Sequence, residues 1–382
     1  MKIIFNRQEA IKACAPLMCA VSTKGPIPET EGILIEANSP TGCTLTTFDT
    51  EKGIRINFEA NVVEEGSYVI NAQKFNQTIK VMDSEEIILS VDSKGIATFE
   101  SGRSTHKTGS LSASNFPEIP YLTTEKGFKI KQATLRKMLL KVSYAMGVND
   151  PRPVLNGCYV RTVGDELSLV ACDTFKLAVC SCKTEFEKLD NASSTDFSFI
   201  IPVKSVNELV KLLSDDEDDV ATVYMSYKNI VIHMGGIIFF SRLINGDYLD
   251  YDRVIIKNHK IFVTLEKDQL LSALERASLI TEEKISGNMR PNVKLEICDD
   301  ILKVSAVSTA GSIYDEVPVE HDGEDISISF KNRFLSDSVR ACTADRVKIA
   351  LSSKLMSINI KPADEDENIK ELFMLLPVRT KD

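Results

Sequence analysis

The sequence lacks any long hydrophobic run. Nowhere do about 18 apolar residues follow one another, which is roughly what a helix needs to cross a bilayer. The start, MKIIFNRQEA, has a run of only three apolar residues, Ile3 to Phe5, before Asn6 and Arg7, too few for the apolar core of a signal peptide. We therefore expect a cytoplasmic protein with no membrane segment.

Metal-binding and disulfide patterns are also missing. The nine cysteines are an odd number, stand mostly in apolar runs and form no CxxC, which favours reduced, buried thiols. The four histidines, His106, His233, His259 and His321, lie far apart, so a zinc site has little support. The acidic runs at 214–219 and 363–371 lack the spacing of a calcium loop and indicate solvated turns. We expect no metal and no other cofactor.

What the chain does have is length and internal repetition. Its 382 residues, 43% hydrophobic and 26% charged, suffice for two or three domains with real cores. The stretches MKIIFNRQEAIKACAPL, GFKIKQATLRKMLLKV and IFVTLEKDQLLSALERA repeat one pattern. In each, alternation ends at Phe5, Ile130 or Leu265, and a helical period follows. The helical stripes are Ala10, Cys14 and Leu17; Leu135, Leu139 and Val142; Leu270, Leu274 and Ala277.

A second strand-to-helix unit follows in each copy. The strands end at Ile70, Ile201 and Phe330, and the expected buried helix positions are Phe75, Ile79, Val206, Val210, Leu335 and Val339. Strands rich in β-branched residues stand between the helices. The sequence thus predicts an α+β fold of three tandem domains, at 1–122, 126–255 and 259–382, each with two helices on antiparallel sheet.

The stretch LVACDTFKLAVCS at 169–181 raises the question of a reactive thiol, because Cys172 precedes Asp173 and Lys176 follows. The repeat aligns Asp173 with Asp49 and Ser308, and it aligns Cys172 with Phe48 and Val307. If Cys172 were a catalytic thiol, the equivalent positions of the other two copies would not be expected to hold Phe and Val. A structural corner is therefore the favoured reading. The alternative is a thiol enzyme that pairs Cys172 with Asp173 or His233.

Charge is segregated along the chain. The six helical segments (6–15, 72–82, 131–143, 203–214, 266–279 and 331–343) together carry +9, so a chain of net −10 leaves −19 elsewhere. Twelve of their cations would line the attractive surface: Arg7, Lys12, Lys74, Lys80, Arg136, Lys137, Lys141, Lys204, Lys211, Lys331, Arg333 and Arg340. Solvated helix faces are the ordinary explanation, but the asymmetry favours attraction of phosphates. Without a base-reading motif, such contact would be independent of sequence.

Several motifs carry a resemblance to a known family. Phe116 and Pro117 after SLSASN, RPVLNG at 152–157, CDTFKLAVCS at 172–181 and LLPVR at 375–379 resemble the bacterial sliding clamps, the beta subunits of DNA polymerase III. The resemblance covers essentially the whole chain. It implies a head-to-tail homodimer whose six domains form a closed ring around duplex DNA. It also implies a processivity factor for DNA replication, a non-catalytic subunit of the polymerase holoenzyme.

The resemblance further implies a cleft between the second and third domains. There, a short peptide of the replicative polymerase, the clamp loader or another DNA-processing protein would bind. Carried onto this chain, the walls are Arg152, Leu155, Cys172, Thr174, Phe175, Lys176, Leu177, Leu249, Arg253, Val254, Leu355, Ser357, Met374 and Leu376. The family often has Gly-His-Arg at 174–176 and Pro at 249, so this chain departs from it there.

Two other sites come with the resemblance. Lys24 and Lys204 match basic DNA-contacting positions of the family. The predicted DNA-facing residues are then Lys24, Lys74, Lys80, Arg136, Lys137, Lys141, Lys204, Lys211, Lys331, Arg333 and Arg340. Lys74 and His106 would meet Leu279 and Ile280 at the boundary between subunits, where an aromatic or aliphatic residue is expected in place of His106. A scaffold that does not bind DNA is a further alternative, which the basic helices argue against.

Overall fold

A computed structural model describes the fold over residues 1–40, 42–120, 127–183, 187–188, 197–282, 291–309, 311–364 and 369–379. Contacts divide the chain into two compact units. The first contains residues 1–136, 186–193 and 207–243, and the second contains 137–185, 194–206 and 244–382. The predicted domain limits at 122, 126 and 382 lie outside the described residues.

The first predicted strand-to-helix unit is present in all three repeats. Three strands each lead directly into a helix: β1 (Lys2–Asn6) into α1 (Arg7–Leu17), β10 (Gly127–Lys131) into α3 (Gln132–Ser143), and β19 (Ile261–Glu266) into α5 (Lys267–Thr281). The Asn6 side chain accepts hydrogen bonds from the backbone N–H groups of Gln8 and Glu9, which caps the start of α1. All nine predicted stripe residues are buried.

The second strand-to-helix unit is present as well. Its pairs are β6 (Gly66–Asn71) with α2 (Ala72–Val81), β15 (Phe197–Pro202) with α4 (Val203–Leu212), and β24 (Ile326–Phe330) with α6 (Asn332–Ala341). The prediction for Val210 is wrong, because this residue is only half-buried. The inner stripe instead runs through Val206 and Leu209 of α4 and continues to Leu213 just past its end, a spacing of three and then four residues that keeps one helix face inward.

The first unit contains one sheet of fourteen strands in the order β14-β10-β16-β17-β18-β4-β3-β2-β6-β9-β8-β7-β1-β5. Its further strands are β2 (Gly32–Ser39), β3 (Gly42–Phe48), β4 (Lys52–Glu59), β5 (Asn61–Glu64), β7 (Glu86–Val91), β8 (Ile96–Ser101), β9 (Ser104–Ser112), β14 (Glu187–Lys188), β16 (Val220–Met225), β17 (Asn229–Met234) and β18 (Ile237–Arg242). Strand β4 pairs antiparallel with β18, with Ile54 opposite Phe239. This pairing joins the first repeat to the second.

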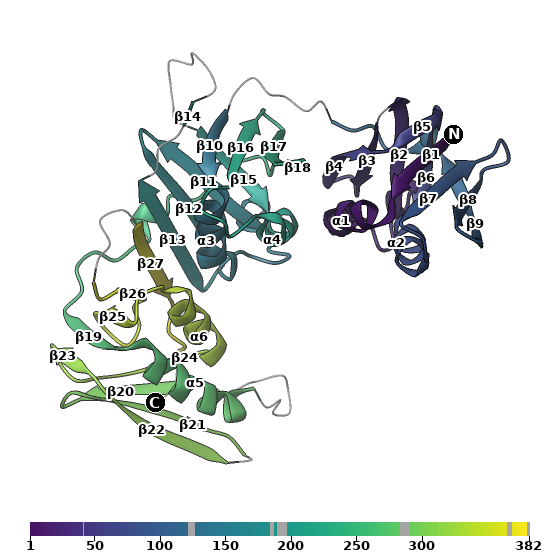
Figure 1. Cartoon of the computed structure of the whole chain (residues 1–382). Coiled ribbons are helices and arrows are strands. Elements are labelled where there is room, and N and C mark those ends of the chain that lie inside the picture. The colour runs from purple at the N-terminus through teal and green to yellow at the C-terminus, as the bar shows by residue number, and fades with distance from the viewer. Residues whose placement is uncertain are drawn as a thin grey trace. The chain divides into compact units, whose positions relative to one another are not determined.

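The second unit contains a nine-stranded sheet, β15-β11-β12-β13-β27-β26-β25-β19-β23, and a four-stranded sheet, β22-β21-β20-β24 (Figure 1). The further strands are β11 (Gly157–Val163), β12 (Glu166–Cys172), β13 (Lys176–Lys183), β20 (Val293–Cys298), β21 (Ile301–Val307), β22 (Ser312–Pro318), β23 (Glu320–Asp322), β25 (Arg346–Leu351), β26 (Ile358–Pro362) and β27 (Ile369–Leu375). Strand β13 pairs with β27, with Ala178 opposite Phe373. The second repeat is therefore joined to the third by the same kind of strand pair.

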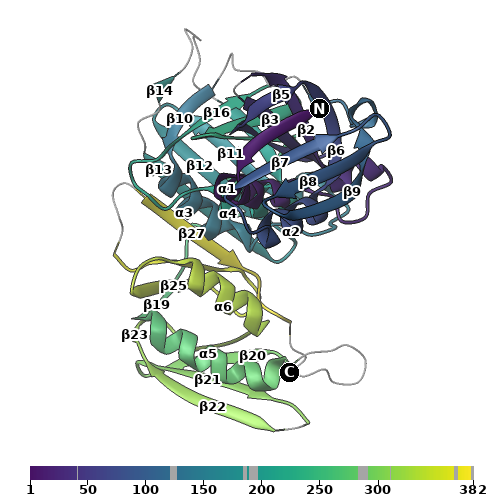
Figure 2. The same cartoon turned by 45° about the vertical axis from the view of Figure 1, so that its right-hand side comes forward.

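Helices cover one face of these sheets. In the second unit, α5 and α6 run beside each other (Figure 2), and Asn332 at the start of α6 donates its side-chain N–H to the carbonyl of Leu274 on α5 at 2.9 Å. The leucine and alanine stripe of α5 is fully buried.

The corner that aligns Asp49, Asp173 and Ser308 is one turn built three times. The backbone N–H of each donates to the carbonyl three residues later, at 3.0, 3.0 and 2.8 Å. The Asp173 carboxylate also accepts from the N–H groups of Phe175 and Lys176, both at 2.7 Å. The structural interpretation of this stretch is thus confirmed.

Candidate functional site

A buried apolar cluster lies where β12, β13 and β27 meet. It consists of Leu155, Val170, Cys172, Leu177 and Met374. Strand alternation places Leu177 and Met374 on one face of the sheet, where they are direct cross-strand neighbours. We call these five residues the junction cluster, because β13 belongs to the second repeat and β27 to the third.

A segment after the second repeat covers the junction cluster. Tyr248, Leu249, Tyr251 and Ile255 pack against it from the region of a short 3-10 helix, η5 (Tyr251–Arg253). The ring of Tyr248 stacks on that of Tyr159 with centroids 4.8 Å apart and planes 3° apart. Burial raises the pKa of the Tyr248 hydroxyl above its ordinary value. The cover is therefore held by aromatic packing.

Cys172 is an inert member of this cluster. Only 8% of it is exposed, its Sγ donates to the carbonyl of Asp173 at 2.9 Å, and burial raises the pKa of the thiol to about 12. A nucleophilic cysteine needs a lowered pKa. All nine cysteines are free. The thiol-enzyme alternative thus has no activated thiol at Cys172.

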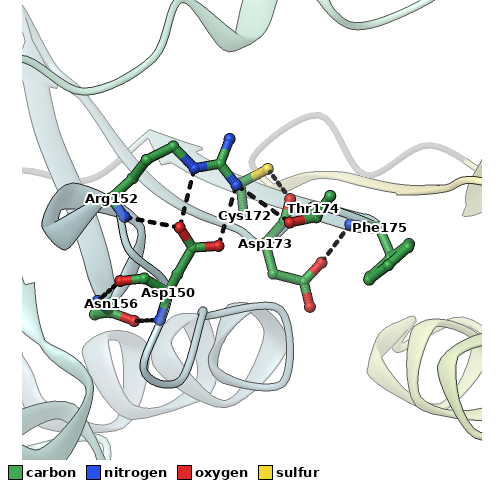
Figure 3. Close-up of polar contacts among 7 residues, drawn as sticks. All are labelled: Asp150, Arg152, Asn156, Cys172, Asp173, Thr174 and Phe175. Carbon is green, nitrogen blue, oxygen red and sulfur yellow. Dashed lines mark hydrogen bonds and ion pairs between the residues drawn. The ribbon is translucent and has the colours of Figure 1, made fainter.

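A polar border adjoins the cluster (Figure 3). The Arg152 guanidinium donates to both Asp150 carboxylate oxygens, at 2.9 and 3.1 Å, and to the Thr174 hydroxyl at 3.1 Å. The hydrogen bond from Arg152 lowers the pKa of Asp150. Asn156 fixes the same loop, because its side chain exchanges two 2.8 Å hydrogen bonds with the Asp150 backbone. Arg152 is thus held beside Cys172 and Thr174.

Two predicted cleft residues lie elsewhere. Phe175 points away from Arg152 (Figure 3) and its ring packs on Phe334 of α6 at 5.9 Å, with the Lys331 ammonium 4.6 Å from the Phe175 ring. Lys176 is buried; its ammonium donates to the carbonyl of Tyr144 at 2.9 Å and is 3.2 Å from Asp173. Because Leu177 faces the junction cluster, alternation directs Lys176 to the opposite face.

The other predicted wall residues form an exposed rim or a support. Val254, Leu355 and Leu376 expose 46%, 59% and 39% of their surface, and the Leu376 N–H donates to the Phe175 carbonyl at 3.0 Å. Ser357 is buried, and Arg253 forms a 2.7 Å ion pair with Asp250. Of the predicted residues, Leu155, Cys172, Leu177, Leu249 and Met374 are thus brought together.

Sequence reasoning missed a concavity on the same sheet face. Its volume is about 680 Å³, and it is lined among others by Arg161, Ser181, Tyr251, Ile255 and Lys370. Tyr251 and Ile255 also contact the junction cluster, so the two features adjoin. The segment that carries Tyr251 and Ile255 has no regular apolar period in the sequence. Its aromatic residues are the only local sign that it packs against the sheet.

Most of the predicted DNA-facing cations have local partners. Arg136 bonds to Asp215 and to the Val210 carbonyl, Lys211 pairs with Glu208, and both Arg333 and Arg340 lie near Asp337. Arg7 donates to the carbonyls of Ile79 and Lys80 at the end of α2. Lys24, Lys74 and Lys80 are exposed. The exposed cations are therefore more available for contact with phosphates than the cations that already have local partners.

Lys141 does not fit the prediction of a DNA-facing residue. It is only 7% exposed, and its ammonium forms an ion pair with the buried carboxylate of Glu371 on β27. Thr343 donates to the same carboxylate from its backbone N–H and its hydroxyl, at 3.1 and 2.7 Å. A buried charge needs such compensation. Lys141 therefore connects α3 to β27 and is not available to a ligand.

Among the described residues, no group of three or more His, Cys, Asp or Glu side chains is placed to hold a metal ion. No helix in the described ranges combines the length and the apolar character needed to cross a bilayer.

Comparison with known proteins agrees with this architecture. Models of the N-terminal, central and C-terminal domains of the DNA polymerase III beta subunit match residues 1–120, 129–250 and 252–377. Three such domains in tandem define a replication clamp, a non-catalytic class of protein. The chain belongs to the DNA polymerase III beta subunit family.

Individual relatives are distant in sequence but match over their whole length. Beta sliding clamps of Staphylococcus aureus and Staphylococcus epidermidis are each 26% identical over 390 residues, with both chains fully covered. The solved beta subunit from Streptococcus pyogenes DNA polymerase is 26% identical with a TM-score of 0.88, and the Bacillus subtilis sliding clamp is 22% identical with a TM-score of 0.92. Each of these structures and this chain cover one another completely.

Proposed function

We propose that the chain forms a homodimeric ring that encircles duplex DNA and tethers the replicative polymerase, the clamp loader and other proteins through a peptide-binding cleft. The observation that carries this proposal is the junction cluster, an apolar site with an exposed apolar rim at the joint between the second and third repeats. Membership in the clamp family supplies the DNA and polymerase partners. The nine free cysteines suit a reducing compartment such as the cytoplasm.

The peptide would add its apolar side chains to the junction cluster. Leu249 and Val254 would form one wall, and Leu355 and Leu376 the other, with the Arg152 guanidinium at the polar end. An apolar anchor contributes roughly 1.5–3 kcal/mol when it is fully buried. Two or three anchors, less the cost of ordering the peptide, give binding that is weak enough to exchange. Exchange is what a site shared by several partners requires.

DNA contact would be electrostatic and independent of sequence. The exposed cations Lys24, Lys74 and Lys80 would offer the least encumbered charges, with Lys137 and Lys204 adding to the field. Arg136, Lys211, Lys331, Arg333 and Arg340 would contribute more weakly, because neighbouring carboxylates or aromatic rings already engage them. Such contact releases counterions from phosphates, so its strength falls as salt rises.

The dimer would close the ring through strand edges. Strand β22 ends its sheet order, and the 104–109 part of β9 pairs only with β8 among the described strands. Unpaired edges invite pairing with another chain. A head-to-tail pair of copies would cover each β9 edge with a β22 edge, which satisfies both without open ends.

The test is topological. Protein loaded by a clamp loader onto nicked circular DNA should stay bound through gel filtration and should be released when the circle is linearised. Equal retention on circular and linear DNA would overturn encirclement. A chain that is monomeric at micromolar concentration by light scattering, with no dimer after crosslinking, would overturn the ring.

A further inference from the structure

Hydrogen-bond registers define which residues are equivalent in the three repeats. Stepping across consecutive strand pairs from Ile3 leads to Leu89, Phe99 and then His106. The equivalent path from Phe128 ends at Phe239, and the path from Val263 ends at Phe373. His106 thus occupies the position at which both other repeats place a fully buried phenylalanine.

The same stepping identifies equivalent residues on β4, β13 and β22, the strands at the other edge of each repeat. Pairings from Val69, Ile200 and Ser329 lead to Arg55, Val179 and Tyr314. One residue earlier on each strand stand Ile54, Ala178 and Ile313. Phe239 lies opposite Ile54, and Phe373 lies opposite Ala178. A third joint of the same kind would set His106 opposite Ile313 of a second copy.

The surroundings of His106 on its own chain are apolar. Its ring centroid is 6.4 Å from that of Phe99, which in turn contacts Phe75 at 5.7 Å. The exposed Lys74 precedes Phe75 on α2. Glu100 on β8 and Lys107 on β9 lie on the opposite sheet face by alternation. His106 itself is exposed in the single chain.

The surface that would cover His106 is also poor in compensating charge. Ile313 shares its strand face with Asp315, whose two carboxylate oxygens are each 2.9 Å from the Arg276 guanidinium of α5. Farther along α5, Leu279 is exposed and Ile280 is half-buried. Glu316 points to the other face, and Glu275 is exposed beside Arg276. Lys74 and Arg276 balance Asp315 and Glu275 in charge, and Glu282 at the end of α5 is exposed. The carboxylate nearest Ile313 along its strand, Asp315, is thus already paired with Arg276.

We propose that His106 is buried at the seam between two copies of this chain, in register with Ile313, and that protonation of His106 opens the ring. This inference rests on the proposed dimer. The histidine side chain ordinarily has a pKa near 6.5, and burial among apolar groups disfavours its charged form. The dimer therefore binds fewer protons than two monomers do, and association weakens as pH falls.

The size of the effect follows from linkage. If the seam admits only the neutral ring, lowering pH from 7.5 to 5.5 weakens each seam by about 10-fold. A ring has two seams, so the dimer dissociation constant should rise by about 100-fold over the same interval. Phenylalanine at position 106 would restore the side chain of the other two joints and remove the proton.

The experiment measures the dimer dissociation constant of the full-length chain by analytical ultracentrifugation at pH 7.5, 6.5 and 5.5. The His106→Phe variant should dimerise more tightly and with little dependence on pH. His233→Phe is the matched control on β17 and should keep the wild-type pH dependence. Circular dichroism at pH 5.5 verifies that each variant is folded.

The outcomes separate this inference from the function on which it rests. A wild-type dimer whose constant is unchanged by pH, or tighter at pH 5.5, overturns the role of His106 and leaves the ring intact. Absence of a dimer at every pH overturns the ring itself. Loss of the pH dependence in His233→Phe but not in His106→Phe would also refute the assignment.

Disulfide crosslinking tests the proposed register between β9 of one copy and β22 of the other. Lys107→Cys combined with Ser312→Cys would place two exposed cysteines directly opposite each other across the seam, and oxidation should yield a covalent dimer. Lys107→Cys with Tyr314→Cys is the control, displaced by two residues on the same face, and should crosslink at least 10-fold more slowly. Equal rates for the two pairs would contradict the register.

Discussion

At the residue scale, the properties of Cys172 follow from burial. Its thiol has a pKa of about 12, so at pH 7 only about one molecule in 10⁵ carries the reactive thiolate. We expect iodoacetamide to label Cys172 in the folded chain very slowly, with a rate that rises about tenfold per pH unit up to pH 10. Mass spectrometry of labelled peptides measures this. Rapid labelling at pH 7 would contradict the inert assignment.

The Cys172→Ser variant tests the same residue through function. Because no thiol chemistry is involved, affinity for a polymerase-derived peptide should fall by less than about tenfold, the effect of roughly 1.4 kcal/mol. Isothermal titration with that peptide provides the measurement. If activity vanished while the peptide still bound normally, the enzyme alternative would be restored.

Sequence reasoning found the corner at Asp173 but not the direction of every side chain near it. The family resemblance assigns Lys176 and Leu177 to the same cleft wall, although adjacent residues of a strand face opposite ways. Lys141 was grouped with exposed helix cations, although its partner Glu371 is 230 residues away. Alternation could have corrected the first assignment. The second depends on a contact between repeats that no local pattern encodes.

At the element scale, the Lys141–Glu371 pair connects α3 with β27. Lys141→Met leaves a carboxylate buried without its cation, which should lower the free energy of unfolding by about 3–5 kcal/mol. Urea unfolding followed by circular dichroism provides the measurement. Lys12→Met, which removes an exposed pair with Glu9, is the control and should cost less than about 1 kcal/mol.

A double variant sharpens that prediction. Lys141→Met with Glu371→Met removes both charges, and stability should recover most of the loss seen in Lys141→Met alone. A double variant that is as unstable as the single one would show that the Thr343 hydrogen bonds, rather than the ion pair, stabilise this contact.

The rim of the junction cluster offers a test that leaves the core intact. Leu355→Asp and Leu376→Asp change exposed side chains, so the fold should persist, while each lost apolar contact should weaken binding of a polymerase-derived peptide by about tenfold or more. Fluorescence anisotropy with a labelled peptide measures the affinity. Val220→Asp, an exposed strand position on β16, is the matched control. Unchanged affinity in both rim variants would place the peptide elsewhere.

The regular helices were more predictable from the sequence than the irregular segment that covers the junction cluster. The change of period located the six α-helices of the described residues, because burial of one helix face imposes a spacing that the sequence must carry. The family resemblance predicted Leu249, Arg253 and Val254 as cleft walls, whereas no local pattern indicated Tyr248, Tyr251 and Ile255 of the same covering segment. It packs by irregular aromatic contacts, which leave no period to detect.

At the scale of the whole molecule, charge should govern retention on DNA. Lys24→Glu with Lys80→Glu reverses two exposed cations, so loading by a clamp loader should fall and its salt dependence should become shallower, by roughly one unit of slope for each lost phosphate contact. Loading assays between 50 and 200 mM salt provide the measurement. Lys257→Glu, which changes an exposed lysine outside the predicted DNA-facing set, is the control. Equal loading of all variants would exclude these cations from the DNA path.

The pairing of β13 with β27 has a consequence for chain continuity. This ladder, the junction cluster and the Lys141–Glu371 pair join the second repeat to the third by noncovalent contacts between segments that are far apart in sequence. The peptide link near residue 258 therefore carries none of the binding energy of the joint. A protease that nicks the chain there would leave two pieces that still hold each other by seven backbone pairs, and co-expressed halves should reassemble without being covalently connected.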